Sequence, residues 1–217
     1  LYKKIPFTFA VMMIGTLAIT GFPLLSGYFS KDMIIEAAFA SQSAGSEFAF
    51  VMTVAAALMT SFYSWRLIFL TFFGESRADK HTFDHAHEGP FVMKFPLALL
   101  AFGALFAGAY FSTSFIGDNK VTFWNGSLVV AAGDVMDAAH NVPAAVVKAP
   151  FIAMLLGLFI ALRFYAPKVT LPKAAALGGT IAFLLAWIFV PNDYAKYYSA
   201  ILFVLSLYST LYVFGRV

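Results

Sequence analysis

Three ionisable side chains in one apolar stretch have the types and spacing of a proton path. Lys31 and Asp32 are adjacent, and Glu36 follows Asp32 by four residues. Residues four apart lie on one face of a helix. A low dielectric disfavours the charged form of a lysine and a neighbouring carboxylate favours it, so such an amine can take up and release a proton. Ionisable groups inside membrane segments mark ion or proton pathways.

The element that carries these groups, residues 5–40, is predicted to be a broken membrane helix. As one straight helix it would be roughly 54 Å long, against a bilayer core of about 30 Å. Gly21, Pro23, Ser26 and Gly27 gather at one point, and a proline removes a backbone donor and kinks a helix. A break at membrane depth is tolerated beside protein or a water-filled cavity. We therefore expect the first element to be discontinuous just before Lys31.

Each of these residues also has a purely structural interpretation. Lys31 could extend its amine to the membrane boundary. Asp32 points about 100° away from Lys31 in an α-helix, so a tight pair is not expected, and it could simply stabilise a helix N-terminus. Ser30 could be a helix N-cap. Glu36 is either an exposed residue at the helix end or a proton exit.

The composition indicates an integral membrane protein. The chain has 217 residues, of which 61% are hydrophobic and 12% charged, whereas soluble domains are about 45–50% apolar and about 25% charged. The absence of cysteine excludes disulfides and cysteine-ligated metals. The chain begins at Leu1 without a signal-peptide pattern, so we expect a fragment or split part of a larger protein.

Long apolar runs predict an all-α membrane protein with about six transmembrane helices in one domain over residues 1–217. Small and hydroxyl residues in the second run favour close helix packing. A polar loop over 74–90 and a surface stretch over 114–143 separate three of the segments. The predicted segments are 5–40, 48–73, 91–112, 147–166, 174–190 and 197–214.

The distribution of basic residues supports this number of crossings. Call the side on which the chain begins side A and the opposite side, side B. Basic residues are enriched on the cytoplasmic or matrix side of membrane proteins, so side A is that side. Side A would carry Lys3, Lys4, Arg77, Lys80, Lys94, Arg163, Lys168, Lys173 and Arg216, and side B only Lys120, Lys148 and Lys196.

The remaining polar residues favour structural roles. Arg66 lies near side A, where an interhelical pair or an extended side chain is the simpler interpretation. His81, His85 and His87 are best explained as part of a solvated loop, and His140 as a surface residue. The sequence contains no phosphate loop, nucleophile triad, nucleic-acid patch or cofactor motif, and we expect no metal site.

Several motifs resemble one known family. Gly21-Phe-Pro23 followed by Gly27-Tyr-Phe-Ser-Lys-Asp32 is similar to the twelfth transmembrane helix of the distal antiporter-like subunit of respiratory complex I, subunit L or subunit 5. Met59-Thr-Ser-Phe-Tyr-Ser-Trp-Arg66 resembles the next helix of that family. Loop and helix motifs around 85–90, 123–126, 140–143 and 150–157 continue the likeness. It covers about residues 1–166, whereas residues 167–217 diverge.

The resemblance implies a proton-translocating subunit of NADH:quinone oxidoreductase in an energy-transducing membrane, bacterial or mitochondrial. Lys31 would be the protonatable residue of the outlet half-channel, and Asp32 would belong to the same path. This chain would hold no cofactor itself. NADH, FMN, iron–sulfur clusters and quinone would bind to partner subunits of the membrane enzyme.

Two departures from the family qualify that expectation. The N-terminal helices are absent, so this chain would pair with other membrane-arm subunits, with the missing part of its own subunit and with lipids, not with nucleic acid. Beyond about Pro172 the sequence has two short apolar segments where the family has a long lateral helix, which leaves open whether that helix is lost, replaced or supplied by another chain. The alternatives are a subunit of an Mrp-type Na⁺/H⁺ antiporter and a structural membrane-arm piece that does not pump.

Overall fold

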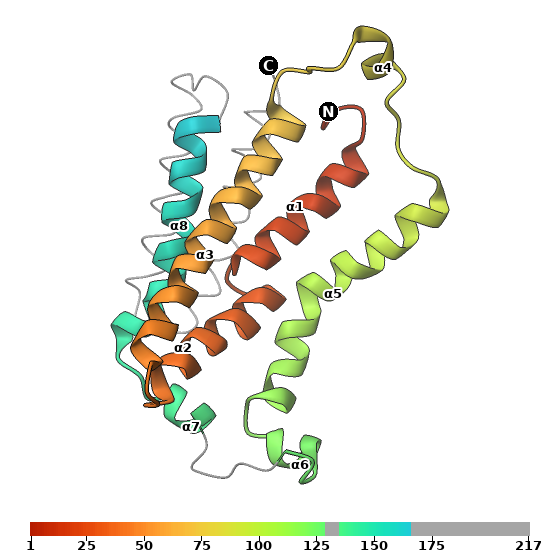
Figure 1. Cartoon of the computed structure of the whole chain (residues 1–217). Coiled ribbons are helices and arrows are strands. Elements are labelled where there is room, and N and C mark those ends of the chain that lie inside the picture. Colours follow the sequence, from red (N-terminus) through yellow and green to blue (C-terminus); the bar gives the residue numbers. More distant parts are fainter. Residues whose placement is uncertain (129–134, 166–217) are drawn as a thin grey trace, which may run out of the picture.

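The computed structural model describes residues 1–128 and 135–165 of the chain. The elements in that part are all helical (Figure 1), which confirms the predicted fold class. They are α1 (Pro6–Thr20), the π-helix η1 (Tyr28–Asp32), α2 (Met33–Ala40), α3 (Ser46–Ile68), the π-helix η2 (Phe69–Phe73), α4 (Lys80–Asp84), α5 (Phe91–Phe115), α6 (Lys120–Trp124), α7 (Val135–Ala139) and α8 (Ala144–Tyr165).

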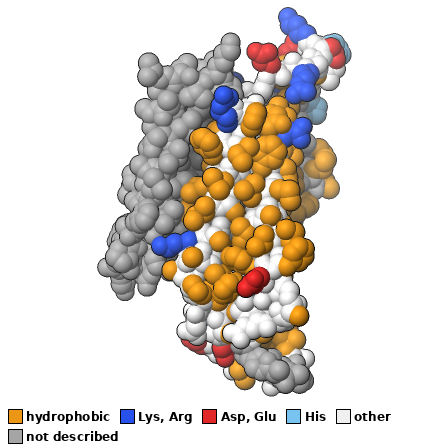
Figure 2. Space-filling view, turned by 60° about the vertical axis from the view of Figure 1, so that its left-hand side comes forward, with side chains coloured by type: hydrophobic (Ala, Val, Ile, Leu, Met, Phe, Trp, Pro, Cys, Tyr) orange, Lys and Arg blue, Asp and Glu red, His pale blue; other side chains and the backbone are white. Residues whose placement is uncertain are grey.

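Three of these helices are long and apolar enough to cross a membrane: Ser46–Phe73, Phe91–Phe115 and Ala144–Tyr165. They correspond to the predicted second, third and fourth segments. Hydrophobic side chains cover the middle of the face in Figure 2, and charged side chains gather mostly towards its ends. The predicted segments 174–190 and 197–214, with Lys168, Lys173, Lys196 and Arg216, lie outside the described residues.

The first segment is discontinuous, as predicted. Helix α1 has 15 residues and is therefore about 22 Å long, too short to cross a bilayer core of about 30 Å. The chain then turns through Gly21–Gly27 and resumes as η1, which runs directly into α2. We call residues 21–27 the break.

Helices α1, α3 and α8 pack side by side, with α5 on the other side of α1 (Figure 1). One buried cluster joins α1, the end of α3 with η2, and α8, through Met13, Ile68, Phe72 and Ala161. A second cluster packs the break against α8 through Phe22, Leu25, Phe151 and Met154. The break is therefore held inside protein, which is where a membrane helix can be interrupted.

Small residues bring α3 and α8 into close contact, as the sequence indicated. The hydroxyl of Ser61 is fully buried and donates a 2.6 Å hydrogen bond to the carbonyl of Met154. A Cβ atom on Gly157 would lie 2.5 Å from the carbonyl oxygen of Leu58. These two contacts hold α8 closely against α3.

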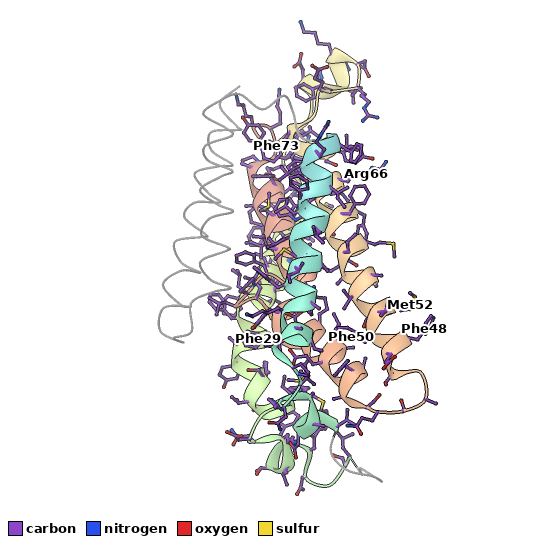
Figure 3. The ribbon with its side chains drawn as sticks, turned by 90° about the vertical axis from the view of Figure 1, so that its left-hand side faces the viewer. Phe29, Phe48, Phe50, Met52, Arg66 and Phe73 are labelled. Carbon is purple, nitrogen blue, oxygen red and sulfur yellow. The ribbon has the colours of Figure 1, made fainter. Side chains whose placement is uncertain are left out.

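The two ends of the bundle carry different short elements. The start of α1, helix α4 and the end of α8 lie at the upper end in Figure 1, and α6 and α7 lie at the lower end. Figure 3 shows Arg66 at the same end as Phe73, and Phe48 and Met52 at the other end of α3. The upper end is side A and the lower end is side B.

Candidate functional site

Local turn chemistry ends α1 at the break. Gly21 adopts a left-handed conformation with φ +81°, and its N–H donates to the carbonyl of Ala18. The N–H of Phe22 donates to the carbonyl of Leu17 at 3.0 Å. A left-handed glycine followed by such bonds is a common way to end a helix. The sequence therefore encodes the stop itself, independently of the surrounding helices.

Leu24 keeps the chain turning after α1. It has φ +71°, which is uncommon for a residue other than glycine. Pro23 precedes it, and the N–H of Leu25 donates to the carbonyl of Phe22 at 3.2 Å. Non-glycine residues in this region cost about 1–3 kcal/mol and persist where surrounding structure fixes them, often at functional sites.

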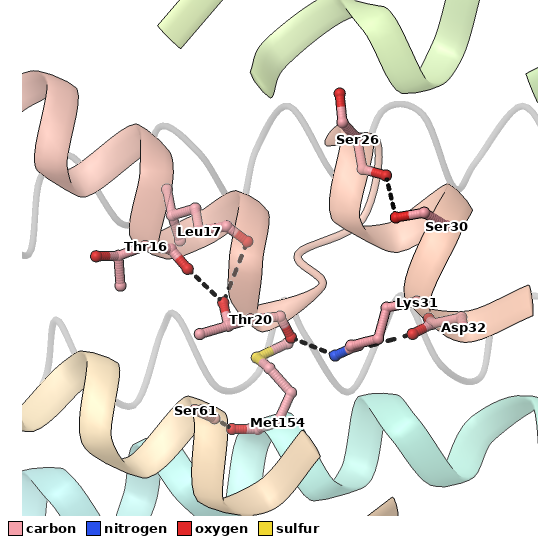
Figure 4. A network of polar contacts seen from close by, with 9 residues as sticks. All are labelled: Thr16, Leu17, Thr20, Ser26, Ser30, Lys31, Asp32, Ser61 and Met154. Atoms are coloured by element: carbon pink, nitrogen blue, oxygen red, sulfur yellow. Dashed lines mark hydrogen bonds and ion pairs between the residues drawn. The ribbon is translucent and has the colours of Figure 1, made fainter. Parts of the chain in front are cut away.

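Lys31 reaches back across the break to the end of α1. Its Nζ donates a 2.7 Å hydrogen bond to the carbonyl oxygen of Thr20 (Figure 4). The last carbonyls of a helix lack intrahelical partners and carry the negative end of its dipole, so a cation is stabilised there. The Lys31 side chain is 22% exposed. The amine thus points back towards the end of α1.

Asp32 lies closer to Lys31 than sequence spacing suggested. The Lys31 Nζ and the Asp32 Oδ1 are 3.9 Å apart, and the Asp32 side chain is 10% exposed. The reason is local: residues 28–32 form a π-helical turn, which is wider than an α-helical one, and the lysine bends back towards the break. Within the described part of the chain, Oδ1 accepts no hydrogen bond. The two side chains therefore form an ion pair, but their charged atoms are too far apart for a direct hydrogen bond.

Two glycines make space for this arrangement. A Cβ atom on Gly21 would collide with Nζ of Lys31, and one on Gly27 would collide with the carbonyl of Ala18. Glycine is the residue that allows backbone or ligand groups to approach this closely. The break is thus shaped around the lysine amine.

Ser26 ties the break to α5. Its hydroxyl donates to the carbonyl of Gly103 at 2.8 Å and accepts from the N–H of Gly108 at 2.9 Å. Those two groups belong to the backbone of α5, so the hydroxyl is inserted into its hydrogen-bond ladder. Ser30 donates to the carbonyl of Ser26 and does not act as an N-cap, because η1 continues into α2 without a new helix start.

Glu36 lies one turn beyond Asp32 on α2 and is half-buried. Helix α2 packs against α7, and His140 directly follows α7. Lys31, Asp32 and Glu36 thus form a series that leads from the break towards side B. The roles of these residues in a proton path stay predictions.

A loop carboxylate holds the opposite end of α1. Glu88 accepts hydrogen bonds from the N–H groups of Phe7 and Thr8 at 2.6 and 3.2 Å, and from the hydroxyl of Thr8 at 2.8 Å. Burial raises the pKa of the Glu88 carboxyl, but these hydrogen bonds outweigh it and hold that pKa below its ordinary value. Sequence reasoning missed this contact because it joins residues 80 apart or more.

The other polar residues lie away from the break. The guanidinium of Arg66 lies 5.3 Å from the centroid of the Tyr165 ring, a cation–π contact near side A. His81 lies in α4, a short helix that the sequence did not predict, and His85 follows that helix; the two ring centroids are 4.2 Å apart. Among the described residues, no group of three or more acidic or histidine side chains is arranged to hold a metal ion.

Comparison with known proteins gives a consistent answer. The family described as NADH:quinone oxidoreductase/Mrp antiporter, TM, matches residues 1–60, which contain the whole broken helix. NADH-quinone oxidoreductase subunit L of Rhodobacter capsulatus is 42% identical over 259 aligned positions, covering 87% of this chain and 36% of the relative. NADH-ubiquinone oxidoreductase chain 5 of Phytophthora infestans is 39% identical, covering 76% of this chain and 25% of the relative.

Subunit L of Rickettsia bellii is 34% identical over 79% of this chain and 26% of its own length. The chain therefore spans about a third or less of the length of these relatives. The family is a transmembrane one and the relatives are named as subunits of one respiratory enzyme, which confirms the predicted multi-pass membrane location. With its broken first helix and its lysine–aspartate pair, this chain belongs to the family of NADH-quinone oxidoreductase subunit L and chain 5.

Proposed function

We propose that this chain forms the outlet-side half of a proton channel in NADH:quinone oxidoreductase, with Lys31 as the proton carrier. The observation that carries the proposal is the position of the Lys31 amine, between the end of a broken helix and a buried carboxylate. A charged group held at such a break inside a membrane bundle supports an ion-pathway function. The relatives named above are subunits of that enzyme, which favours it over an Mrp-type Na⁺/H⁺ antiporter.

The proposed step moves one proton from Lys31 to Asp32. The ammonium of Lys31 gives up a proton and becomes a neutral amine, and the carboxylate of Asp32 takes it and becomes a carboxylic acid. The separation of 3.9 Å is one that a water molecule can bridge. A neutral pair is also better tolerated than two separated charges where little water is present.

Glu36 would receive the proton next and pass it towards side B. Asp32 and Glu36 are four residues apart, so their Cβ atoms lie about 5–6 Å from each other on one helix face. Asp32 returns to a carboxylate when its proton leaves, and Lys31 is reloaded from the inlet side. That inlet, the missing N-terminal part of the subunit, the membrane-arm partners and the lipids would all lie outside this chain. NADH, FMN, iron–sulfur clusters and quinone would likewise be bound by partner subunits.

The proposal is tested with Lys31→Ala and Lys31→Arg in the assembled enzyme. Arginine keeps a charged donor for the carbonyl of Thr20 but does not release its proton in proteins. We expect both variants to translocate fewer protons per NADH oxidised in sealed vesicles. If only Lys31→Ala had this effect, the lysine would act as a structural cap and not as a carrier.

Lys148→Ala is the matched control, because Lys148 is an exposed lysine at the start of α8. It should leave the number of protons per NADH unchanged. An unchanged number in both Lys31 variants would instead support the structural, non-pumping alternative. Sodium-dependent transport without NADH oxidation would support the antiporter.

A further inference from the structure

The side B ends of α2 and α7 meet at one cavity. Phe39 and Ala40, at the end of α2, line it together with Ala138 and Asn141, which flank His140 in the sequence. The cavity has a volume of about 450 Å³, and Glu47 at the start of α3 also lines it. The cavity therefore lies between the end of α2 and the residues on either side of His140 in the sequence.

His140 has a fixed orientation at this place. Its Nδ1 lies 2.6 Å from the carbonyl oxygen of Met136, an acceptor, so Nδ1 carries the hydrogen. The neutral ring then has its lone pair on Nε2. The residue is exposed, so that nitrogen can exchange protons with solvent. A histidine held in this tautomer is prepared to accept a proton from a group deeper in the bundle.

The nearest carboxylate in sequence on α2, the helix that packs against α7, is Glu36. The two interact electrostatically, and Glu36 is half-buried whereas His140 is exposed. The other charged groups nearby have different positions: Glu47 lies on the cavity wall and Asp137 forms an ion pair with Lys120 at 2.6 Å. Glu36 is thus half-buried on α2, and His140 is exposed directly after α7, the helix that packs against α2 at the side B end.

We infer that His140 accepts the proton that leaves Glu36 and releases it to water on side B. Glu36 passes from carboxylic acid to carboxylate, and Nε2 of His140 takes up the proton to give the imidazolium. The imidazolium then gives the proton to water or buffer and returns to its neutral form. The inference rests on the proposed function and extends its path by one residue.

The test uses His140→Asn in the assembled enzyme in sealed vesicles with side B accessible. The asparagine amide can occupy the position of Nδ1–H and keep the bond to Met136, while Nε2 is lost. We expect proton release to side B to slow severalfold at unchanged quinone reduction under uncoupled conditions. Imidazole added on side B should restore the rate, because His140 is exposed and a small dissolved base can replace the missing nitrogen. A purely structural histidine would not be rescued in this way.

Two further variants give controls. His85→Asn removes an exposed histidine from the side A end, and Asn141→Ala changes the neighbour of His140 on the same cavity. Both should release protons at the unmodified rate and show no response to imidazole. A wild-type rate in His140→Asn, or a slow rate that imidazole does not restore, would overturn the inference.

The two proposals can fail separately. If Lys31→Ala stops pumping and His140→Asn does not slow it, only the exit residue is wrong. If Lys31→Ala pumps normally, the proposed function fails regardless of His140.

Discussion

The Nζ of Lys31 lies 2.7 Å from the carbonyl oxygen of Thr20, eleven residues earlier in the chain. That carbonyl is among the last of α1 and has no continuing helix to satisfy it. The lysine therefore occupies the position that the next turn of backbone would have taken. The break and the ionisable group are one structural unit.

Replacing Gly21 should disturb that unit directly. In Gly21→Ala the new Cβ would meet Nζ of Lys31, and alanine at φ +81° costs about 1–2 kcal/mol in addition. We expect fewer protons per NADH, and a shorter half-life of the assembled enzyme on heating. Gly15→Ala is the control, because a Cβ there has nothing within 4 Å. If the two variants translocated equal numbers of protons per NADH and had equal half-lives on heating, Gly21 would not be needed to make room for the Lys31 amine.

Removing the Ser26 hydroxyl should loosen α5 from the break. Ser26→Ala leaves the carbonyl of Gly103 and the N–H of Gly108 without their partner in a part-buried site, at a cost of about 1–3 kcal/mol. We expect a lower temperature of thermal inactivation and faster hydrogen exchange in the middle of α5. Ser30→Ala serves as the comparison, since that exposed hydroxyl donates only to the carbonyl of Ser26. If both variants showed the same hydrogen-exchange rates in α5, the hydrogen bonds of Ser26 would not stabilise that helix.

A methyl group at Gly157 should separate α3 from α8. Its Cβ would lie 2.5 Å from the carbonyl of Leu58 and 2.7 Å from the Cβ of Ser61, and neither belongs to a flexible chain end. Overpacking of this kind costs about 1–3 kcal/mol. We expect Gly157→Ala to lower the yield of assembled enzyme. Gly103→Ala, where a Cβ finds open space, should assemble normally, and a normal yield from both would contradict the packing argument.

The hydrogen bonds from the start of α1 to Glu88 should stabilise the fold by the same amount across the neutral pH range. Because hydrogen bonds hold the Glu88 pKa below its ordinary value of 4.5, this interaction stabilises the fold above that value. Its contribution is lost only as the pH falls through the lowered pKa. Glu88→Gln should therefore reduce the midpoint of thermal unfolding by a constant amount between about pH 5 and pH 8, with a smaller difference in stronger acid.

Glu75→Gln provides the control for Glu88, because Glu75 is an exposed carboxylate of the same loop. It should leave the midpoint unchanged at every pH. A Glu88→Gln difference that grew with acidity would have the wrong sign for a carboxylate stabilised in its charged form.

Features that are local in the chain could be predicted from the sequence. The cluster around Gly21 and Pro23 gave the break, and long apolar runs gave the membrane helices, because turn residues and hydrophobic length act locally. The position of Lys31 beside the break followed from the same stretch. The hydrogen bond from Lys31 to the carbonyl of Thr20 could not be predicted, because a backbone carbonyl has no sequence signature.

Contacts between distant segments could not be predicted in this way. Ser26 meets α5 across 77 and 82 residues, and Glu88 meets Thr8 across 80. Serine and glutamate occur on many surfaces, so their type alone does not identify a partner. The π-helical turn that brings Asp32 within 3.9 Å of Lys31 was missed for another reason: spacing rules assume an α-helix.

The role of Lys31 at the end of α1 has one more consequence. If the amine moved away to deliver its charge elsewhere, the buried Thr20 carbonyl oxygen would lose its hydrogen-bond donor until another donor reached it. Large movements of the Lys31 side chain are therefore unfavourable, and the proton must bind and leave while the amine stays beside Thr20.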